Sequence, residues 1–339
     1  MRRGAVPGHC RGDAGVALVV VMLLVALLVT IVGEFAQAMR LEAVTATNFR
    51  AAVAETWLAQ AGYQRAVAEI LPEVLAHELD ETGTLAFRRV RLLAPKVPER
   101  LDVRVDPGRL SYRLTDENAR LNLNRVPRDV LDRLLRELAI EKSQRDVILD
   151  SIQDWRDPNE EHRLNGAESD YYLGLAAPYR SKNADFDAVD ELLQVQGITR
   201  EILYGRPDTP GLIEHLTVWG TTAVNVNTAS PIVLRALGLA PAEVDLLIGR
   251  RPYVDLTQLP PALRRGSQRT TSDTFRIEAW AGGPVPGGRV LTTVVQRRTE
   301  AGQVEALPLS WRWSDAPRPV ARAPGAAPDG ATSGARATP

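Results

Sequence analysis

The longest hydrophobic segment of the chain is an uninterrupted apolar run from Val16 to Gly33, with no charged residue before Glu34. A helix that crosses a bilayer needs about 20 apolar residues, so this run is close to the length of a membrane span. Arginines at positions 2, 3 and 11 precede it. Because positively charged flanks stay on the cytoplasmic side, the pattern predicts one span over residues 16–33, with the bulk of the chain exported.

The residues after this run have the pattern of an amphipathic helix. No proline occurs before Pro72, and Gly62 is the one glycine between Ala36 and Leu75. Apolar residues recur there every three or four positions. They are Leu41, Val44, Phe49, Val53, Trp57, Tyr63, Val67, Ile70 and Val74. We therefore predict one long helix over residues 16–78, an arrangement that resembles a type IV pilin-like subunit.

A cleavable secretory signal is the alternative interpretation of the N-terminus. Such a signal has a shorter apolar core of about 7 to 15 residues and a small-residue cleavage site. Ala36 and Ala38 lie beyond the run, but no clean Ala-x-Ala exit follows it directly. The pattern favours an apolar segment that stays with the mature chain.

Alternating segments further along the chain predict an antiparallel sheet in two parts. Residues 101–105 and 109–114 flank the turn Asp106-Pro-Gly108, and a second group covers 274–280, 289–295 and 305–313. The intervening sequence has helical character. We predict an α+β fold in which the long helix packs on early strands (79–118) and late strands (266–313), with a helical domain (119–265) inserted between them. Residues 314–339 are rich in proline and alanine and predict a disordered tail.

The predicted helical domain contains an internal repeat. Leu121-Asn-Leu-Asn-Arg-Val-Pro127 precedes one pair of short helices, and Val224-Asn-Val-Asn-Thr-Ala-Ser-Pro231 precedes another. The asparagines are expected to satisfy backbone groups at turns and helix starts. The units resemble helix-hairpin-helix or SAM-like modules, so a membrane-anchored protein that binds nucleic acid for DNA uptake is the alternative function. Against it, the first hairpin lacks glycine, the second contains only Gly238, and the first unit is acidic.

An acidic loop is the best candidate for site chemistry. Asp154, Asp157, Glu168 and Asp170 lie in a segment rich in carboxylates and amides, with His162 as its single histidine. Oxygen ligands without cysteine suit a hard cation, so we predict a Ca²⁺ site formed by these four residues. The spacing differs from that of an EF-hand, and a solvated acidic loop with helix caps remains an open alternative.

Composition is consistent with an exported, mostly globular protein of moderate size. The chain has 339 residues, 45% of them hydrophobic, with a net charge of −1, which is sufficient for a sizeable core. Cys10, the single cysteine, lies in the predicted leader (residues 1–15), so no disulfide is expected after processing. The sequence contains no nucleophile elbow, phosphate loop or dinucleotide fingerprint, and we predict no enzymatic activity.

Several of these motifs together resemble the type II secretion system minor pseudopilin K (GspK) family. They are the Gly15-Val16-Ala-Leu junction, a valine rather than glutamate at Val20, the Asp154-Trp-Arg-Asp157 segment and the Gly166-Ala-Glu168 segment. Most pilin-like proteins have a glutamate at the position of Val20, and its absence is characteristic of the K type.

The resemblance implies a processing site, a location and a set of partners. A prepilin peptidase would cut between Gly15 and Val16, and the acidic loop would bind Ca²⁺. The protein would lie in the inner membrane with a single span and its bulk in the periplasm. It would act at or near the tip of the pseudopilus, where it would help to initiate assembly and the export of folded periplasmic proteins. The implied partners are the I- and J-type minor pseudopilins, the major pseudopilin, the inner-membrane secretion platform and secreted cargo.

Overall fold

The computed structural model describes residues 13–106, 108–259, 263 and 268–315. The predicted tail and most of the predicted leader lie outside these residues. The chain forms two compact units, residues 1–57 and residues 58–339, which are described separately.

The first unit contains the greater part of helix α1 (Asp13–Ile70), and Gly15 and Val16 lie within this helix. Its apolar side chains are exposed along the predicted span. The most apolar window of the helix has a mean hydropathy of 3.2, and none of that window is buried. The helix is therefore long and apolar enough to cross a membrane, although a signal sequence near an N-terminus has the same properties.

Helix α1 ends at Ile70, before the predicted boundary at residue 78. Pro72 explains the difference, because a proline disfavours the helical conformation of the residue before it. The predicted helix was therefore too long at its C-terminal end. The residues that follow form a hairpin of β1 (Ala76–Leu79) and β2 (Leu85–Arg88), which the sequence analysis missed.

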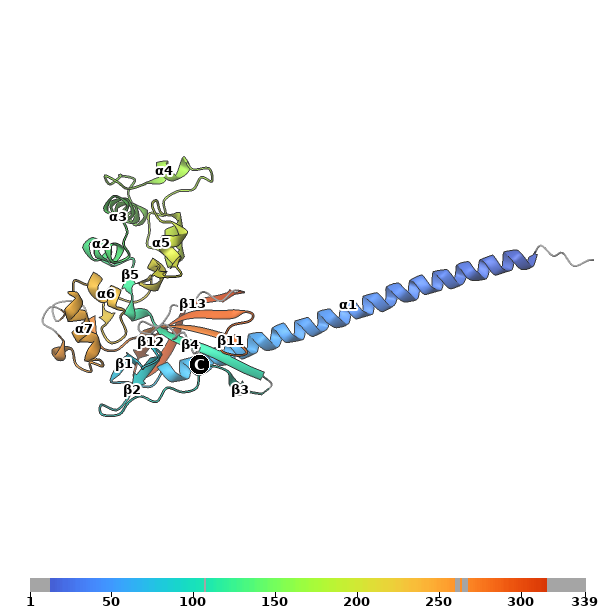
Figure 1. The fold of residues 1–339 in the computed structure, drawn as a ribbon, viewed down its shortest axis with the longest axis horizontal. Coiled ribbons are helices and arrows are strands. Elements are labelled where there is room, and N and C mark those ends of the chain that lie inside the picture. Colours follow the sequence, from blue (N-terminus) through green and yellow to red (C-terminus); the bar gives the residue numbers. More distant parts are fainter. Residues whose placement is uncertain (1–12, 107, 260–262, 264–267, 316–339) are drawn as a thin grey trace, which may run out of the picture. The chain divides into compact units, whose positions relative to one another are not determined.

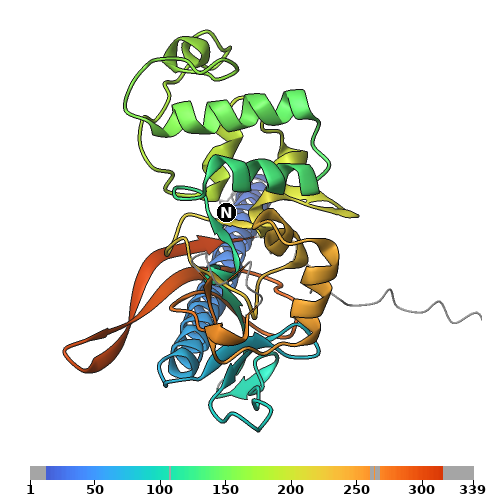
Figure 2. The same ribbon diagram turned by 90° about the vertical axis from the view of Figure 1, so that its left-hand side faces the viewer.

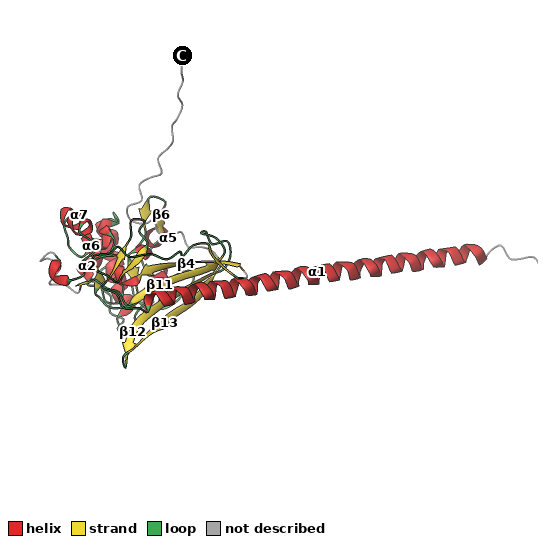
Figure 3. Cartoon of the chain, turned by 90° about the horizontal axis from the view of Figure 1, so that it is seen from below, coloured by secondary structure: helices red, strands yellow, loops and turns green. Residues whose placement is uncertain are grey.

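The main sheet of the second unit has five antiparallel strands in the order β13-β12-β11-β4-β3. The predicted early strands are β3 (Val103–Val105) and β4 (Gly108–Asp116). The predicted late strands are β11 (Thr274–Ala281), β12 (Val290–Glu300) and β13 (Gln303–Ser314). Figure 3 shows β4, β11, β12 and β13 side by side, with most of the short helices gathered beyond one end of them.

The last turns of α1 pack on this sheet and form the first hydrophobic core. Ala59, Tyr63, Ala66 and Ile70 contact a buried sheet face. The helix approaches closely at Gly62, where an added Cβ would lie 3.2 Å from the Cβ of Ala279. A glycine at this position therefore permits the close packing of helix and sheet. The predicted α+β fold, with a long N-terminal helix on an antiparallel sheet, is confirmed.

Residues between β4 and β11 form the helical part of the chain and enclose a second core, from Leu121 to Leu263. The pair of short helices predicted after each asparagine motif is present, as α2 with α3 and as α6 with α7, whereas the SAM-like character stays a prediction. The α-helices are α2 (Arg128–Glu137), α3 (Lys142–Arg156), α4 (Ser169–Leu173), α5 (Arg200–Tyr204), α6 (Pro231–Ala236) and α7 (Pro241–Gly249). The 3₁₀ turns are η1 (Glu117–Ala119), η2 (Val189–Gln194), η3 (Leu212–Glu214) and η4 (Leu256–Gln258). Figures 1 and 2 show α2, α3 and α4 at the end of this unit opposite β1 and β2.

Three pairs of two-residue strands connect the segments of the helical part. They are β5 (Leu121–Asn122) with β8 (Leu216–Thr217), β9 (Val224–Asn225) with β10 (Gln268–Arg269), and β6 (Gly205–Arg206) with β7 (Thr209–Pro210). The first two pairs are parallel, and both contain a copy of the repeated asparagine motif.

The helical part leaves and rejoins the main sheet at adjacent strands. Asp116 at the end of β4 is paired in register with Phe275 near the start of β11. Arg297 of β12 lies close by, and its Nε donates to the carbonyl oxygen of Leu71, just after α1 ends. The helical part is therefore attached at the end of the sheet where α1 stops. Because residues 58–339 form one compact unit, the boundaries 119–265 of a separate domain stay a prediction.

Candidate functional site

The predicted acidic loop follows α3, and the end of this helix provides its first carboxylates. Asp150 and Asp154 lie one turn apart on α3, Asp157 follows the helix, and both helical aspartates are buried. The Asp150 Oδ2 accepts hydrogen bonds from the backbone and side-chain nitrogens of Asn165, and its Oδ1 accepts from Arg128. These contacts fasten the returning loop to α3.

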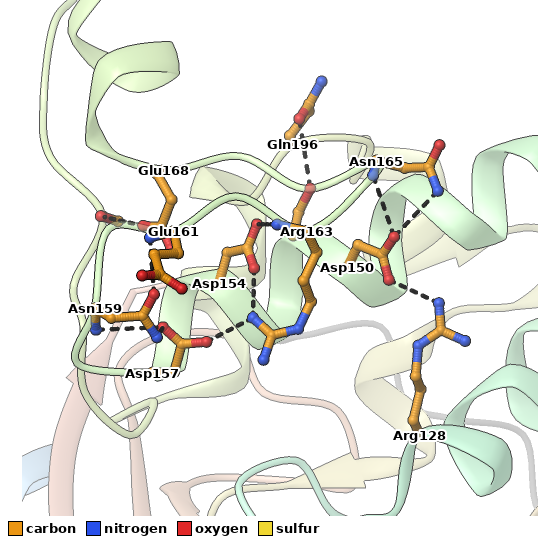
Figure 4. Close-up of polar contacts among 12 residues, drawn as sticks. Arg128, Asp150, Asp154, Asp157, Asn159, Glu161, Arg163, Asn165, Glu168 and Gln196 are labelled. Atoms are coloured by element: carbon orange, nitrogen blue, oxygen red, sulfur yellow. Dashed lines mark hydrogen bonds and ion pairs between the residues drawn. The ribbon is translucent and has the colours of Figure 1, made fainter.

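Arg163 lies between Asp154 and Asp157 (Figure 4). Its Nη1 is 2.5 Å from Asp154 Oδ1 and 2.5 Å from Asp157 Oδ2. Its backbone N–H also donates to Asp154 Oδ2, at 3.2 Å. The guanidinium therefore supplies positive charge at the place where the sequence analysis expected a metal ion.

Among the described residues Glu168 has no cationic partner, unlike Asp154 and Asp157, which pair with Arg163. Glu168 is buried, and the Ser181 hydroxyl donates to its Oε2. Its Oε1 has no hydrogen-bond partner among the described residues. Burial raises the pKa of Glu168 to about 7, and the negative charges of Asp154, Asp157 and Glu160 act in the same direction. In this environment either protonation of the carboxylate or a bound cation would stabilise the folded chain.

Asp170 is separate from this group. Its side chain is 75% exposed, and its Oδ1 is 2.8 Å from the Nε2 of His162. The described residues contain no group of three or more His, Cys, Asp or Glu side chains arranged to hold a metal ion. The four predicted ligands are therefore not assembled as one centre: Asp154 and Asp157 share Arg163, Glu168 lies near them, and Asp170 pairs with a histidine.

Close packing explains the Gly166-Ala-Glu168 segment. An added Cβ at Gly166 would lie 1.8 Å from the Asp154 Oδ2. Trp155, next to Asp154, is buried beside Tyr172, with ring centroids 5.3 Å apart in an edge-to-face arrangement. The conformation of the loop is thus fixed by steric fit and by ion pairs together.

The asparagine repeat bonds backbone groups at turns, as predicted, but it does not cap the helices that follow, whose N-cap positions are Pro127 and Ser230. The side chain of Asn124 both donates to the carbonyl oxygen and accepts from the N–H of Phe186. Asn227 makes the same two contacts with the backbone of Tyr253. The first asparagine of each pair, Asn122 or Asn225, accepts from the N–H two residues later. Each copy of the motif therefore ties a strand end to a distant loop.

A buried polar cluster, which was not predicted from the sequence, lies where the helical part joins the sheet. Its centre is Asp116, whose Oδ2 accepts from Asn225 Nδ2 (2.9 Å), Thr228 Oγ1 (2.6 Å) and Ser272 Oγ (2.5 Å). The N–H of Asn118 donates to its Oδ1. Burial raises the pKa of Asp116, against the effect of these hydrogen bonds. The one sequence signal was Asn225 in the repeat, which does not identify its partner.

Glu117, beside Asp116, is paired with two arginines. Its Oε1 is 2.6 Å from Arg276 Nε and 3.1 Å from Arg120 Nη1. Burial acts to raise its pKa, but the two cations outweigh burial and hold the pKa at about 2. The carboxylates of Asp116 and Glu117 thus have all their hydrogen-bond partners within the chain, and they join the sheet to the helical part.

Because two histidines are buried, we expect the folded protein to lose stability in acid. Burial lowers the pKa of His77 to about 3 and that of His215 to about 4, from an ordinary value of 6.5. The unfolded chain therefore binds protons below pH 6.5 that the folded chain does not, and stability should fall as pH decreases from about 6.5 toward 4, by roughly 1 kcal/mol per histidine per pH unit. Glu168 has the opposite sign, because its raised pKa favours the folded state at lower pH between about 4.5 and 7.

Chemical denaturation across this pH range would measure the effect. In His77→Gln and His215→Gln variants the free energy of unfolding should fall less steeply as the pH decreases. A wild-type stability that is flat from pH 7 to 4, or that rises steadily toward acid, would contradict the prediction.

Two arginines near the second predicted hairpin have partners within the chain. Arg235 pairs with Glu137, and Arg251 donates to the carbonyl oxygen of Ala229. The connection between α2 and α3 has no glycine, and Gly238 is the one glycine between α6 and α7. This arrangement does not favour a phosphate-binding hairpin.

A long N-terminal helix against an antiparallel sheet is the pilin-like fold predicted from the sequence, and here the sheet carries a helical insertion. Residues 113–204 match the family "Type II secretion system (T2SS), protein K". A solved structure with a similar fold belongs to the GspK-GspI-GspJ complex from the type 2 secretion system of enterotoxigenic Escherichia coli. Its matched chain has 16% sequence identity and a TM-score of 0.58, and the match covers 80% of this chain and 99% of that chain.

Relatives in sequence have the same description. "Type II secretion system protein K" of Pseudomonas aeruginosa is 29% identical over 258 residues, which are 71% of this chain and 73% of the relative. The protein of that description from Aeromonas hydrophila is 26% identical over 216 residues, 58% of this chain and 62% of its own length. The chain thus spans less than two thirds of the Aeromonas protein. Together these matches confirm the predicted resemblance of the chain to type II secretion system protein K.

Proposed function

We propose that the protein is a minor pseudopilin of a type II secretion system, located at or near the tip of the pseudopilus. It would help to initiate pseudopilus assembly and the export of folded periplasmic proteins, without catalysis of its own. The observation that supports this most directly is the pilin-like helix-on-sheet unit with a protein K segment inserted in its sheet.

The attachment point of the helical part supports a position at the tip. The helical part joins the sheet where α1 stops, as the contact of Arg297 with the Leu71 carbonyl oxygen indicates. In a filament of parallel pilin-like subunits, a further subunit would stack beyond this end of the helix. A helical part attached there would obstruct that position.

The proposal includes an anchor and a set of partners. The apolar start of α1 would span the inner membrane, with the bulk of the chain in the periplasm, after a prepilin peptidase has cut between Gly15 and Val16. Pairing with I- and J-type minor pseudopilins is supported by the fold similarity to a chain of a GspK-GspI-GspJ complex. The major pseudopilin, the inner-membrane platform and secreted cargo complete the proposed set.

N-terminal sequencing of the membrane-bound protein tests this function. In cells with a prepilin peptidase we expect a chain that begins at Val16, and in cells without it an intact leader. Gly15→Lys should block processing and secretion, whereas Gly4→Lys, within the leader, should leave both unchanged. An uncut chain in peptidase-positive cells, together with normal secretion in a deletion strain, would overturn the proposal.

We also propose that the acidic loop binds Ca²⁺ through Asp154, Asp157 and Glu168. The oxygen donors fit a hard cation, and the unpartnered buried Oε1 of Glu168 is the observation that supports binding. Arg163 would have to give up its contacts with Asp154 and Asp157. A bound cation would compensate the three carboxylates and stabilise the loop.

Calcium should raise the melting temperature, and more so at pH 8 than at pH 6. Because the pKa of Glu168 is raised to about 7, a proton must leave before a cation binds at pH 6. At a concentration of 100 Kd the stabilisation should be about 2.7 kcal/mol. Differential scanning calorimetry with and without Ca²⁺ measures the shift.

Two variants separate the proposed ligands from the exposed acid. Glu168→Gln should remove the calcium shift, and Asp170→Asn, at the exposed partner of His162, should keep it. If the wild type melts at the same temperature with calcium and with chelator at pH 8, Arg163 is the permanent counter-charge of the loop and the calcium proposal is wrong.

A further inference from the structure

An exposed loop after β2 combines apolar and basic side chains. We call residues 89–96, Arg-Val-Arg-Leu-Leu-Ala-Pro-Lys, the 89–96 loop. Leu92 is 92% exposed, Leu93 63% and Val90 53%. Arg89, Arg91 and Lys96 are also exposed, and the loop contains no acidic residue. Apolar side chains this exposed in a cluster indicate a contact surface.

The conformation of this loop is fixed from beneath by Arg88. The guanidinium binds both carboxylate oxygens of Glu78, at 2.9 and 3.1 Å, and both side chains are largely buried. Its Nη1 also donates to the carbonyl oxygens of Leu93 (2.7 Å) and Arg91 (3.3 Å). The leucines are therefore presented by a preformed turn, so that contact with a partner costs little conformational entropy.

The charges around the leucines are positive and largely uncompensated. None of the ion pairs formed by the described residues involves Arg89, Arg91 or Lys96. Arg91 lies close enough to Asp255 to contribute to the lowering of the pKa of that carboxyl group, after the hydrogen bonds of Thr257. A partner surface that complements the 89–96 loop would therefore be apolar and covered by a layer of negative charge.

We propose that the 89–96 loop is a membrane-contacting surface, in which Leu92 and Leu93 enter the interface of an anionic bilayer and the three cations bind its headgroups. Apolar insertion combined with nearby lysine or arginine is the pattern of peripheral membrane contacts. A stable protein interface uses about 20–30 residues on each side, far more than this loop supplies. A fluid lipid surface accepts a single convex turn without a matching pocket.

The full chain, held by its N-terminal helix in phosphatidylcholine nanodiscs, is suited to the test. Cys10→Ser removes the native thiol, and Ala94→Cys accepts an environment-sensitive fluorophore on the exposed loop. Vesicles with about one anionic phosphatidylglycerol in four lipids are then added, with pure phosphatidylcholine vesicles as reference. We expect a blue shift and co-sedimentation with the anionic vesicles alone, both weakened by added salt.

Matched variants separate the leucines from the cations. Leu92→Ser with Leu93→Ser should weaken vesicle binding at least tenfold. Arg89→Gln with Arg91→Gln should weaken it about twenty-five-fold, since each cation near an anionic surface contributes about fivefold. Leu164→Ser is the control, because that leucine is 96% exposed but lies in the helical part.

Three outcomes would overturn the proposal. They are the absence of a shift with anionic vesicles, equal binding by both loop variants and the wild type, and a shift that requires an added pseudopilin instead of lipid. The last outcome would assign the loop to a protein contact. Because the altered side chains project from the surface, circular dichroism should show an unchanged fold in each variant. The result does not depend on whether the chain supports secretion.

Discussion

Asp116→Ala is expected to lower the free energy of unfolding by roughly 3–5 kcal/mol, which is among the largest effects of a single substitution. Three side-chain donors and one backbone N–H point at this buried carboxylate. Removing the acceptor leaves those donors buried without partners, and each unsatisfied group costs about 1–3 kcal/mol. The loss should appear in chemical denaturation of the full chain in detergent.

Thr115→Ala provides the matched control for this prediction. Thr115 is adjacent on β4 and exposed, so its loss should change stability by less than about 0.5 kcal/mol. Asp116→Asn should also destabilise the protein, because its amide group places a donor where the carboxylate accepted. Equal stability of Asp116→Ala and Thr115→Ala would show that the junction does not depend on this cluster.

Glu69→Ala should cost a similar amount, roughly 3–5 kcal/mol, by leaving a buried cation without its partner. Arg100 makes a forked contact with Glu69, with a shortest distance of 2.6 Å, and its side chain is 5% exposed. The Tyr112 hydroxyl donates to the same carboxylate at 2.5 Å. These contacts hold the last turns of α1 against the sheet, so the variant should release the helix end first.

Hydrogen exchange measured by mass spectrometry should locate this effect in residues 58–70. Glu55→Ala, an exposed glutamate on the same helix, is the control and should leave exchange unchanged. Replacing Glu69 and Arg100 together by similarly sized apolar residues should recover much of the stability, because no charge is then left unpaired. If the double variant is as unstable as Glu69→Ala, the unpaired cation is not the cause.

Local patterns in the sequence predicted the main elements of the fold. The apolar run and the amphipathic stripe are long, so α1 was identified, and β11, β12 and β13 have clear strand character. The hairpin β1–β2 was missed because its few residues continue the helical composition that precedes them. Its turn is set by Asp80, whose Oδ1 accepts from the N–H groups of Thr82 and Thr84, an arrangement that a helical pattern conceals.

The candidate site was predictable only in part, because its pairings depend on the folded chain. The acidic residues were visible in the sequence, but Arg163 was not recognised as their counter-charge, since spacing alone does not say which loop residue turns back toward α3. The role of Asp116 could not be predicted from the sequence for another reason. Its side-chain partners lie 109, 112 and 156 positions away in the sequence.

The pairing of Asp116 with Phe275 means that the two ends of the 157-residue stretch between β4 and β11, residues 117–273, already lie next to each other across a β-ladder. A chain in which a short turn replaced that stretch would still close an ordinary hairpin between β4 and β11. The sheet and the helix end therefore form a scaffold on which insertions can grow, shrink or be exchanged during evolution without rewiring the strand order. In this protein, the hydrogen bonds of the buried junction at Asp116 hold one particular insertion against the sheet.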